Sequence, residues 1–172
     1  MPRYVALLRR VSPLNLRMPA LAQCVEAAGF TNVRTLLSSG NVAFDAARRR
    51  STDALERELE AAMRVGLDRD FLALVRAQRD LQALLASDPF AAFPPMAGAK
   101  RIVAFLRDPA PADLPLPLVH ADARLLAVRG REAFGDYVPG PRGGAFMSVL
   151  ERSLGKRITT RTWDTVAKCA AA

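Results

Sequence analysis

Hydrophobic residues in the first half of the chain form short runs separated by segments with helical spacing. Four segments have the length of strands: Tyr4–Leu8, Asn32–Leu37, Val42–Phe44 and Phe71–Val75. Two amphipathic helices are predicted between them, one with Pro19 in its first turn and Gly29 at its C-cap, the other after Ser51. The resulting strand-helix-strand-strand-helix-strand order over Arg3–Ala77 is the ferredoxin-like arrangement.

The helix after Ser51 shows the clearest amphipathic pattern. An inward stripe is predicted at helical spacing and consists of Leu55, Leu59, Ala62, Met63 and Gly66. Glu56, Glu60 and Arg64 are expected on the solvated face, where carboxylates among arginines typically form ion pairs.

The segment Ser38-Ser39-Gly40-Asn41 between the second and third strands predicts a tight hairpin. Gly40 and Asn41 tolerate positive φ, which a two-residue hairpin turn requires. A functional alternative is that the Ser39 hydroxyl and the Asn41 amide serve as polar ligands at the end of the sheet.

The second half has the order of a looser copy of the first. Its predicted elements are a helix at Leu81–Ala86, strands at Arg101–Arg107, Leu125–Val128 and Arg131–Phe134, a proline-studded crossover at Pro109–Pro117, a turn at Gly140–Gly144, a helix at Phe146–Leu154, a short strand or cap at Ile158–Thr160, and a last helix from Trp163. We therefore predict an α+β protein of two ferredoxin-like subdomains, residues 1–78 and 79–172, with an extra C-terminal helix.

Several strands are apolar at both odd and even positions, as Tyr4–Leu8 and Phe71–Val75 illustrate. A sheet with one wet face would alternate apolar and polar residues. Both sheet faces are therefore expected to be covered, by helices and by the other half of the chain. A homodimer that uses one open face is the alternative, so the chain is a monomer or a homodimer.

The charge balance favours anionic partners. The 172 residues include 25 Lys and Arg against 17 Asp and Glu, a net charge of +8, and the basic residues are nearly all arginine. No apolar run approaches the roughly 18 residues that cross a bilayer, so no membrane partner is expected. Cys24 and Cys169 are far apart, which predicts no disulfide and a cytoplasmic location.

Three ordered segments resemble a known family. They are Met1–Arg9, Ala28–Thr35 and Ser39–Val42, and Leu154–Val166 looks like the closing signature of the same family. The set resembles the bacterial domain-of-unknown-function family 1697. The resemblance implies a cytoplasmic protein of two ferredoxin-like subdomains and transfers no catalytic residues.

The chain also departs from the family's pattern. The loop Arg9–Asn15 is shorter than the family's and lacks its paired glycines, so a glycine-rich phosphate loop is absent from it. Gly143-Gly144 replaces the family's Ser-Lys pair, and Arg161–Thr165 reads Arg-Thr-Trp-Asp-Thr where the family has Arg-Asn-Trp-Asn-Thr. If these positions form the family's ligand site, this member has altered specificity or has lost the site.

No catalytic constellation emerges from the residues. His120 is the only histidine and has no nucleophile placed beside it, so a surface position is expected. One histidine and two distant cysteines give no zinc-type spacing, and we predict neither a metal nor a cofactor. The sequence leaves open whether the protein is an enzyme.

The preferred candidate site is the C-terminal run of cations, hydroxyls and one indole at a helix start, where anions are attracted. Its candidate ligand-binding residues, with those at the end of the first strand and the hairpin, are Arg9, Arg10, Ser39, Asn41, Lys156, Thr159, Thr160, Arg161 and Trp163. The alternative is structural, with Thr162 as an N-cap and Trp163 as a core anchor.

The best functional hypothesis is a binding module for a small anionic ligand, a nucleotide or a phosphorylated metabolite. The alternative is non-specific, electrostatic binding of nucleic acid by Arg3, Arg9, Arg10, Arg17 and Arg48–Arg50. Base stacking would need exposed aromatic residues on the central strands, where only Tyr4 and Phe44 qualify.

Overall fold

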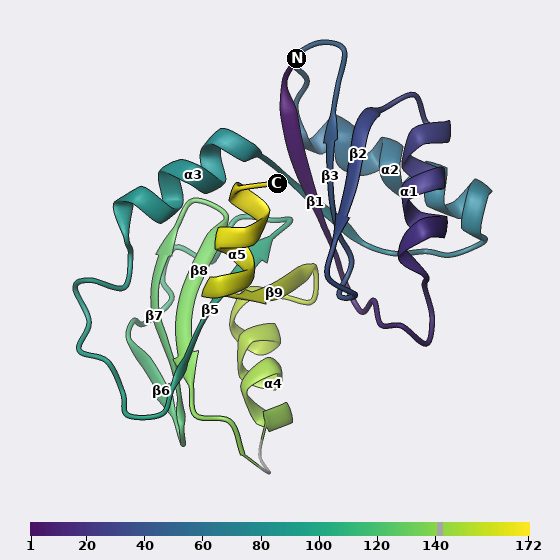
Figure 1. Cartoon of the computed structure of the whole chain (residues 1–172). Helices are drawn as coiled ribbons and strands as arrows, with labels where there is room; N and C mark the ends of the chain where they lie inside the picture. The colour runs from purple at the N-terminus through teal and green to yellow at the C-terminus, as the bar shows by residue number, and fades with distance from the viewer. Residues whose placement is uncertain (141–142) are drawn as a thin grey trace. The chain divides into compact units, whose positions relative to one another are not determined.

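The computed structural model describes residues 1–140 and 143–172 and shows an α+β protein (Figure 1). Its described residues form two antiparallel sheets, of four and five strands, and five helices. The chain divides into two compact units, one of Met1–Ala83 with Ala167–Ala172 and the other of Leu84–Val166. Among the described residues, none of the helices combines the length and the apolar character needed to cross a membrane.

The first unit contains the four-stranded sheet, in the order β2-β3-β1-β4. Its elements are β1 (Arg3–Leu8), α1 (Met18–Ala27), β2 (Thr31–Leu36), β3 (Asn41–Asp45), α2 (Thr52–Leu67), β4 (Ala73–Ala77) and most of α3 (Gln78–Ser87). The predicted order of elements over Arg3–Ala77 is confirmed. The fourth strand begins two residues later than predicted, at Ala73, and continues directly into α3.

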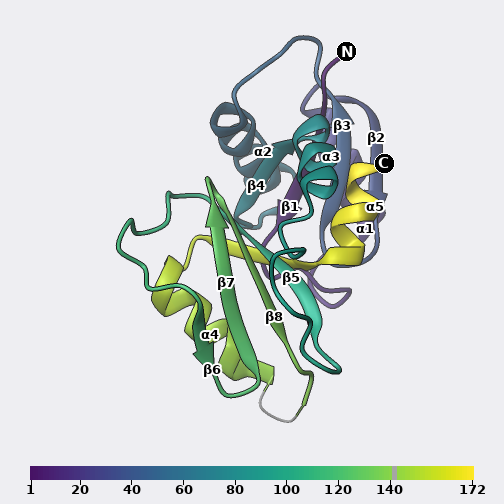
Figure 2. The same cartoon turned by 90° about the vertical axis from the view of Figure 1, so that its left-hand side faces the viewer.

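The second unit contains the five-stranded sheet, in the order β6-β7-β8-β5-β9 (Figure 2). Its elements are β5 (Lys100–Leu106), β6 (Leu118–His120), β7 (Ala123–Arg129), β8 (Glu132–Tyr137), α4 (Gly143–Leu154), β9 (Ile158–Thr162) and the start of α5 (Trp163–Ala170). The order β7-β8-β5-β9 repeats that of β2-β3-β1-β4, and the short edge strand β6 follows the proline-studded crossover in the place of a helix. The predicted turn Gly140–Gly144 includes residues 141 and 142, which lie outside the described residues, whereas Gly143 begins α4.

The core of the first unit forms where α1 and α2 pack on one face of the sheet (Figure 1). Apolar side chains of the helices, such as Leu21, Leu55 and Leu59, contact alternate residues of β1 and β3. The intervening residues Val5 and Leu7 of β1 are buried as well. Residues at both odd and even positions of β1 are therefore buried.

Glu56 corrects the predicted solvated face of α2, because this residue is 0% exposed. Its Oε1 accepts a hydrogen bond of 3.0 Å from the Val75 main-chain N–H, and Glu60 Oε1 accepts one of 3.1 Å from Ala73. The guanidinium of Arg76 lies 3.7 Å from Glu56 Oε1. Strand β4 lies at the edge of the sheet, where its outward N–H groups have no neighbouring strand. The two glutamates accept hydrogen bonds from these groups and so block pairing with a further strand. Helical spacing alone does not reveal a carboxylate that serves a neighbouring strand.

The hairpin between β2 and β3 also differs from the prediction. Its loop runs from Leu37 to Gly40, and these two residues have positive φ, 58° and 83°. Asn41 is the buried first residue of β3, and its side-chain amide donates to Leu36 O at 2.9 Å and to Ser39 Oγ at 3.0 Å. The asparagine closes the loop through its side chain, a role that a two-residue turn does not include.

The second unit has its own core on one face of its sheet. Helix α4 lies beside this sheet (Figure 2). Its Phe146, Leu150 and Leu154 pack against Ile102 and Leu125 of the strands. Across β7 and β8, Arg124 and Asp136 form a bidentate ion pair, with Nε to Oδ1 at 2.9 Å and Nη2 to Oδ2 at 2.5 Å. The pair fixes the register of the two strands beyond a bulge between Leu125 and Ala127.

Candidate functional site

The candidate residues predicted in the first half lie together at one end of the first sheet. The Leu8 N–H donates to Gly40 O at 2.8 Å, which places Arg9 and Arg10 next to the hairpin that carries Ser39 and Asn41. Arg9 is half-buried and Arg10 is exposed, whereas Asn41 is 0% exposed. The hairpin amide is therefore committed to closing its own loop.

The candidate residues predicted near the C-terminus lie on β9 and at the start of α5, in the second unit. Arg161 is only 8% exposed, and its Nη1 donates to Thr159 Oγ1 at 2.7 Å and to Thr160 O at 2.8 Å. Lys156 is exposed in the loop before β9. The guanidinium of Arg161 is thus folded back onto its own strand.

Thr162 and Trp163 make contacts that fit the structural alternative, an N-cap and an anchor for the last helix. Thr162 Oγ1 accepts a hydrogen bond of 3.3 Å from the Thr165 N–H, which is an N-cap contact at the start of α5. The half-buried Trp163 packs edge-on against Phe90, with ring centroids 5.1 Å apart. A small cavity of about 170 Å³ next to β9 is lined by Thr160, Arg161 and Thr162, with Ile102, Tyr137, Phe146 and Met147.

A larger cavity, of about 480 Å³, lies in the first unit. Four arginines line it, Arg3, Arg49, Arg50 and Arg79, and the one carboxylate among its lining residues is Asp80. We call it the basic cavity. The sequence names Arg3 and the run Arg48–Arg50 as basic residues but does not bring them together, because Arg3 and Arg79 lie far from the run along the chain.

Strand pairing and one buried hydroxyl assemble the basic cavity. Tyr4 of β1 pairs with Ala77 at the end of β4, so the start of β1 lies beside the start of α3. The Tyr4 hydroxyl accepts from the Arg50 N–H at 3.0 Å and donates to Arg50 O at 3.1 Å, which holds the loop before α2 against β1. Thr52 and Gln78, the first residues of α2 and α3, line the cavity, so two helix N-termini border it.

The four arginines differ in how their charge is compensated. Arg50 pairs with Glu58 at 2.5 Å, and the exposed Arg79 lies 3.7 Å from Asp80. Arg49 is exposed and forms neither a hydrogen bond nor an ion pair with the described residues. Arg49 is therefore the lining cation whose charge is available to a ligand.

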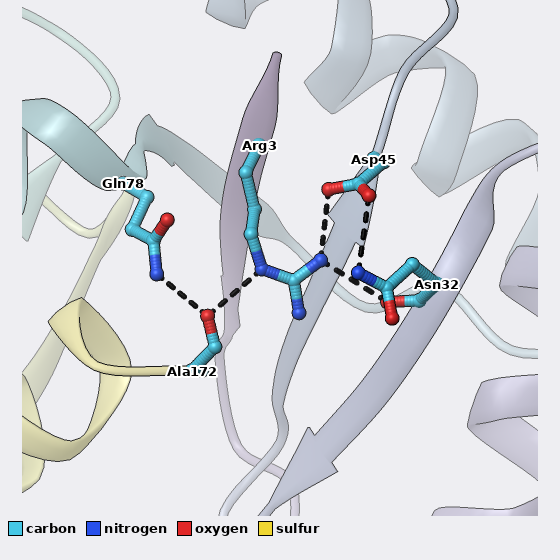
Figure 3. Close-up of polar contacts among 5 residues, drawn as sticks. All are labelled: Arg3, Asn32, Asp45, Gln78 and Ala172. Atoms are coloured by element: carbon cyan, nitrogen blue, oxygen red, sulfur yellow. Dashed lines mark hydrogen bonds and ion pairs between the residues drawn. The ribbon is translucent and has the colours of Figure 1, made fainter. Parts of the chain in front are cut away.

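Arg3 is held in place by a polar cluster (Figure 3). Its Nη1 donates to Asp45 Oδ1 at 2.8 Å and to Asn32 O at 3.2 Å, while its Nε donates to Ala172 O at 2.8 Å. Burial alone would raise the pKa of Asp45, but hydrogen bonds from Arg3 and Asn32 outweigh it, so the pKa lies below its usual value. The ionised carboxylate of Asp45 is thus favoured in the folded chain.

This lowered pKa makes a prediction for acid stability. The ionised Asp45 carboxylate stabilises the folded chain. This stabilisation is fully present above the unfolded Asp pKa of about 3.9 and is lost as the pH falls through the lower pKa of the folded state. In Asp45→Asn, the fall in the free energy of unfolding below about pH 4 should therefore be shallower than in the wild type. Urea titrations of both proteins across this pH range measure it, and parallel profiles would contradict the assignment.

The structure also places the histidine and the two aromatic residues considered in the sequence analysis. His120 is exposed at the end of β6, and Tyr4 and Phe44 are buried in the core of the first unit, so these rings do not offer a stacking surface for bases. Over residues 1–140 and 143–172, no three His, Cys, Asp or Glu side chains cluster as a metal ligand set.

A known protein family matches this two-sheet α+β chain. A family model described as "Protein of unknown function (DUF1697)" matches residues 1–133. The chain belongs to this family, which confirms the resemblance drawn from its sequence. The closing segment Leu154–Val166 lies beyond the matched range.

One solved structure similar to this chain is described as that of the conserved bacterial protein SP0830 from Streptococcus pneumoniae. The TM-score is 0.70 at 20% sequence identity, and the alignment covers 99% of this chain and 97% of that chain. At this identity the likeness shows the shared fold alone. None of the curated proteins compared with this chain matches it.

Proposed function

We propose that this protein is a binding module for a small anionic ligand, a nucleotide or a phosphorylated metabolite, and that the basic cavity is its site. The observation that carries the proposal is a cavity of about 480 Å³ lined by four arginines and one carboxylate. We further assign each unit to the ferredoxin-like class, an assignment supported by the shared strand order of β2-β3-β1-β4 and β7-β8-β5-β9.

Size and charge both support this ligand class. A volume of about 480 Å³ falls within the range of typical small-molecule sites, roughly 300–1,000 Å³. Guanidinium groups match the geometry of phosphate and carboxylate oxygens, and the N-termini of α2 and α3 add partial positive charge. The arginines Arg3 and Arg50 are oriented by Asp45 and Glu58 before a ligand binds.

Arg49→Gln tests the proposal. Loss of one charged hydrogen bond costs about 1.5–3 kcal/mol, so the Kd for adenosine monophosphate should rise roughly 10- to 100-fold in isothermal titration calorimetry. Arg17→Gln is the matched control, because Arg17 is exposed in the same unit and does not line the cavity. An equal change in both variants would mean that net charge, rather than the cavity, governs binding.

Electrostatic nucleic-acid binding is the second candidate, and the exposure of Arg10, Arg17 and Arg48 favours it. It would appear in the same titration with duplex DNA as a log-log salt slope of roughly −0.9 per neutralised phosphate. The C-terminal candidates Lys156, Thr159, Thr160, Arg161 and Trp163 remain a prediction. Lys156→Gln weakening nucleotide binding while Arg49→Gln leaves it unchanged would move the site to β9.

A further inference from the structure

The guanidinium of Arg3 is fixed on one side and only partly used on the other (Figure 3). On the fixed side, Nη1 contacts Asp45 and Asn32, and the side chain of Arg3 is only 16% exposed. The Nε and Nη2 groups form the other edge of the plane. On that edge Nε donates to Ala172 O at 2.8 Å, and Nη2 makes no hydrogen bond with the described residues.

A second donor reaches the same oxygen. Gln78 Nε2 lies 2.6 Å from Ala172 O, so Arg3 and Gln78 converge on a single acceptor (Figure 3). Both residues also line the basic cavity, one from β1 and one from the first turn of α3. Two fixed donors around one oxygen form a binding position for an oxygen atom, and Nη2 beside them is available for a second oxygen.

An oxyanion would use the full edge of Arg3. A carboxylate or a phosphate group presents two oxygens with the spacing of Nε and Nη2, and the resulting bidentate, charge-assisted pair is stronger than a single hydrogen bond. Besides the bonds from Arg3 and Gln78, residues Ala171 and Ala172 make long main-chain hydrogen bonds. The Ala172 N–H donates to Cys169 O at 3.4 Å, and the Ala171 N–H donates to Ala167 O at 3.2 Å and to Lys168 O at 3.3 Å. Gln82 adds one bond of 3.1 Å to Ala170 O.

We propose that Arg3 and Gln78 are the oxyanion subsite of the basic cavity and that the main-chain oxygen of Ala172 occupies it until a ligand binds. A carboxylate or phosphate group of the ligand binds the Nε–Nη2 edge of Arg3 and displaces residues Ala171–Ala172. This inference rests on the proposed function. It adds a contact that positions the ligand, and it identifies the Ala172 oxygen as a competitor of the ligand for the same donors. Ligand affinity therefore depends on how firmly these two residues are docked.

A four-protein cycle tests the subsite by calorimetry with inorganic phosphate and, separately, with malonate. The proteins are the full chain, the chain without Ala171 and Ala172, Arg3→Lys, and Arg3→Lys without those two residues. Removing the competitor should tighten binding about tenfold when Arg3 is present, as expected for coupled residues. The same truncation should tighten binding by less than about twofold in the Arg3→Lys background, because lysine lacks the planar fork of donors. In the shortened chain, Arg3→Lys should weaken binding at least tenfold.

The two ligands distinguish the source of the oxyanion. Tightening for phosphate but not malonate assigns the subsite to phosphate groups, and the reverse assigns it to carboxylates. Thermal unfolding of each variant verifies that it is folded, and lysine retains the charge that faces Asp45. Equal affinities of the full and shortened chains, with Arg49→Gln still weakening binding, would overturn the subsite and leave the cavity standing. No binding by either chain would overturn both proposals.

Discussion

Replacing Glu56 with alanine is expected to lower the free energy of unfolding by about 3–5 kcal/mol. The variant would leave the guanidinium of Arg76, which is 7% exposed, without the carboxylate 3.7 Å away, and would remove the acceptor of the Val75 N–H. Urea denaturation followed by circular dichroism measures the change.

Two companion variants isolate the cause. Glu58→Ala on the same helix removes an ion pair whose side chains are 30% and 34% exposed, so it should cost no more than about 1 kcal/mol. Glu56→Gln with Arg76→Met keeps an acceptor for Val75 and removes the buried cation, and should recover much of the loss. A Glu56→Ala variant as stable as Glu58→Ala would contradict the role assigned to this carboxylate.

Gly40→Ala is expected to destabilise the first unit by about 2–4 kcal/mol. Gly40 has a φ of +83°, and a Cβ atom there would lie 2.8 Å from Val11 Cβ and 3.0 Å from Leu8 Cβ. Both the backbone conformation and the contact with the loop after β1 therefore oppose a side chain. Thermal and urea unfolding of the variant check the magnitude.

Gly29→Ala separates the two causes. Gly29 has a φ of +93°, but a Cβ there would meet no atom within 4 Å. Gly29→Ala should therefore lower the free energy of unfolding only through its strained backbone conformation, by about 1 kcal/mol. If Gly40→Ala cost no more than Gly29→Ala, the close packing of the hairpin against Val11 would not contribute to stability.

Local patterns predict the elements well and their long-range partners poorly. The apolar run Tyr4–Leu8 and the helical stripe beginning at Leu55 predict β1 and α2, because each pattern reports burial in one segment. Helical spacing assigns Glu56 to the solvated face, since only the position of β4 shows that its carboxylate accepts from an edge strand. Asn41 likewise looks like a turn residue, although its amide closes a loop from within β3.

The candidate site also depends on contacts between segments that are distant along the chain. Proximity along the chain favours the run from Lys156 to Trp163, where cations and hydroxyls are consecutive. The basic cavity needs the Tyr4–Ala77 pairing and the Tyr4–Arg50 hydrogen bonds, which join three distant segments. The run Arg48–Arg50 is recognisable as basic in the sequence, but its spatial neighbours Arg3 and Arg79 emerge only from the fold.

The most direct test of the basic cavity is a titration of isotope-labelled protein with adenosine monophosphate, followed by backbone amide chemical shifts in NMR. The largest changes are expected at the cavity residues Arg3, Arg49, Thr52, Gln78 and Arg79. Changes confined to residues 156–163, or no changes at millimolar ligand, would contradict it.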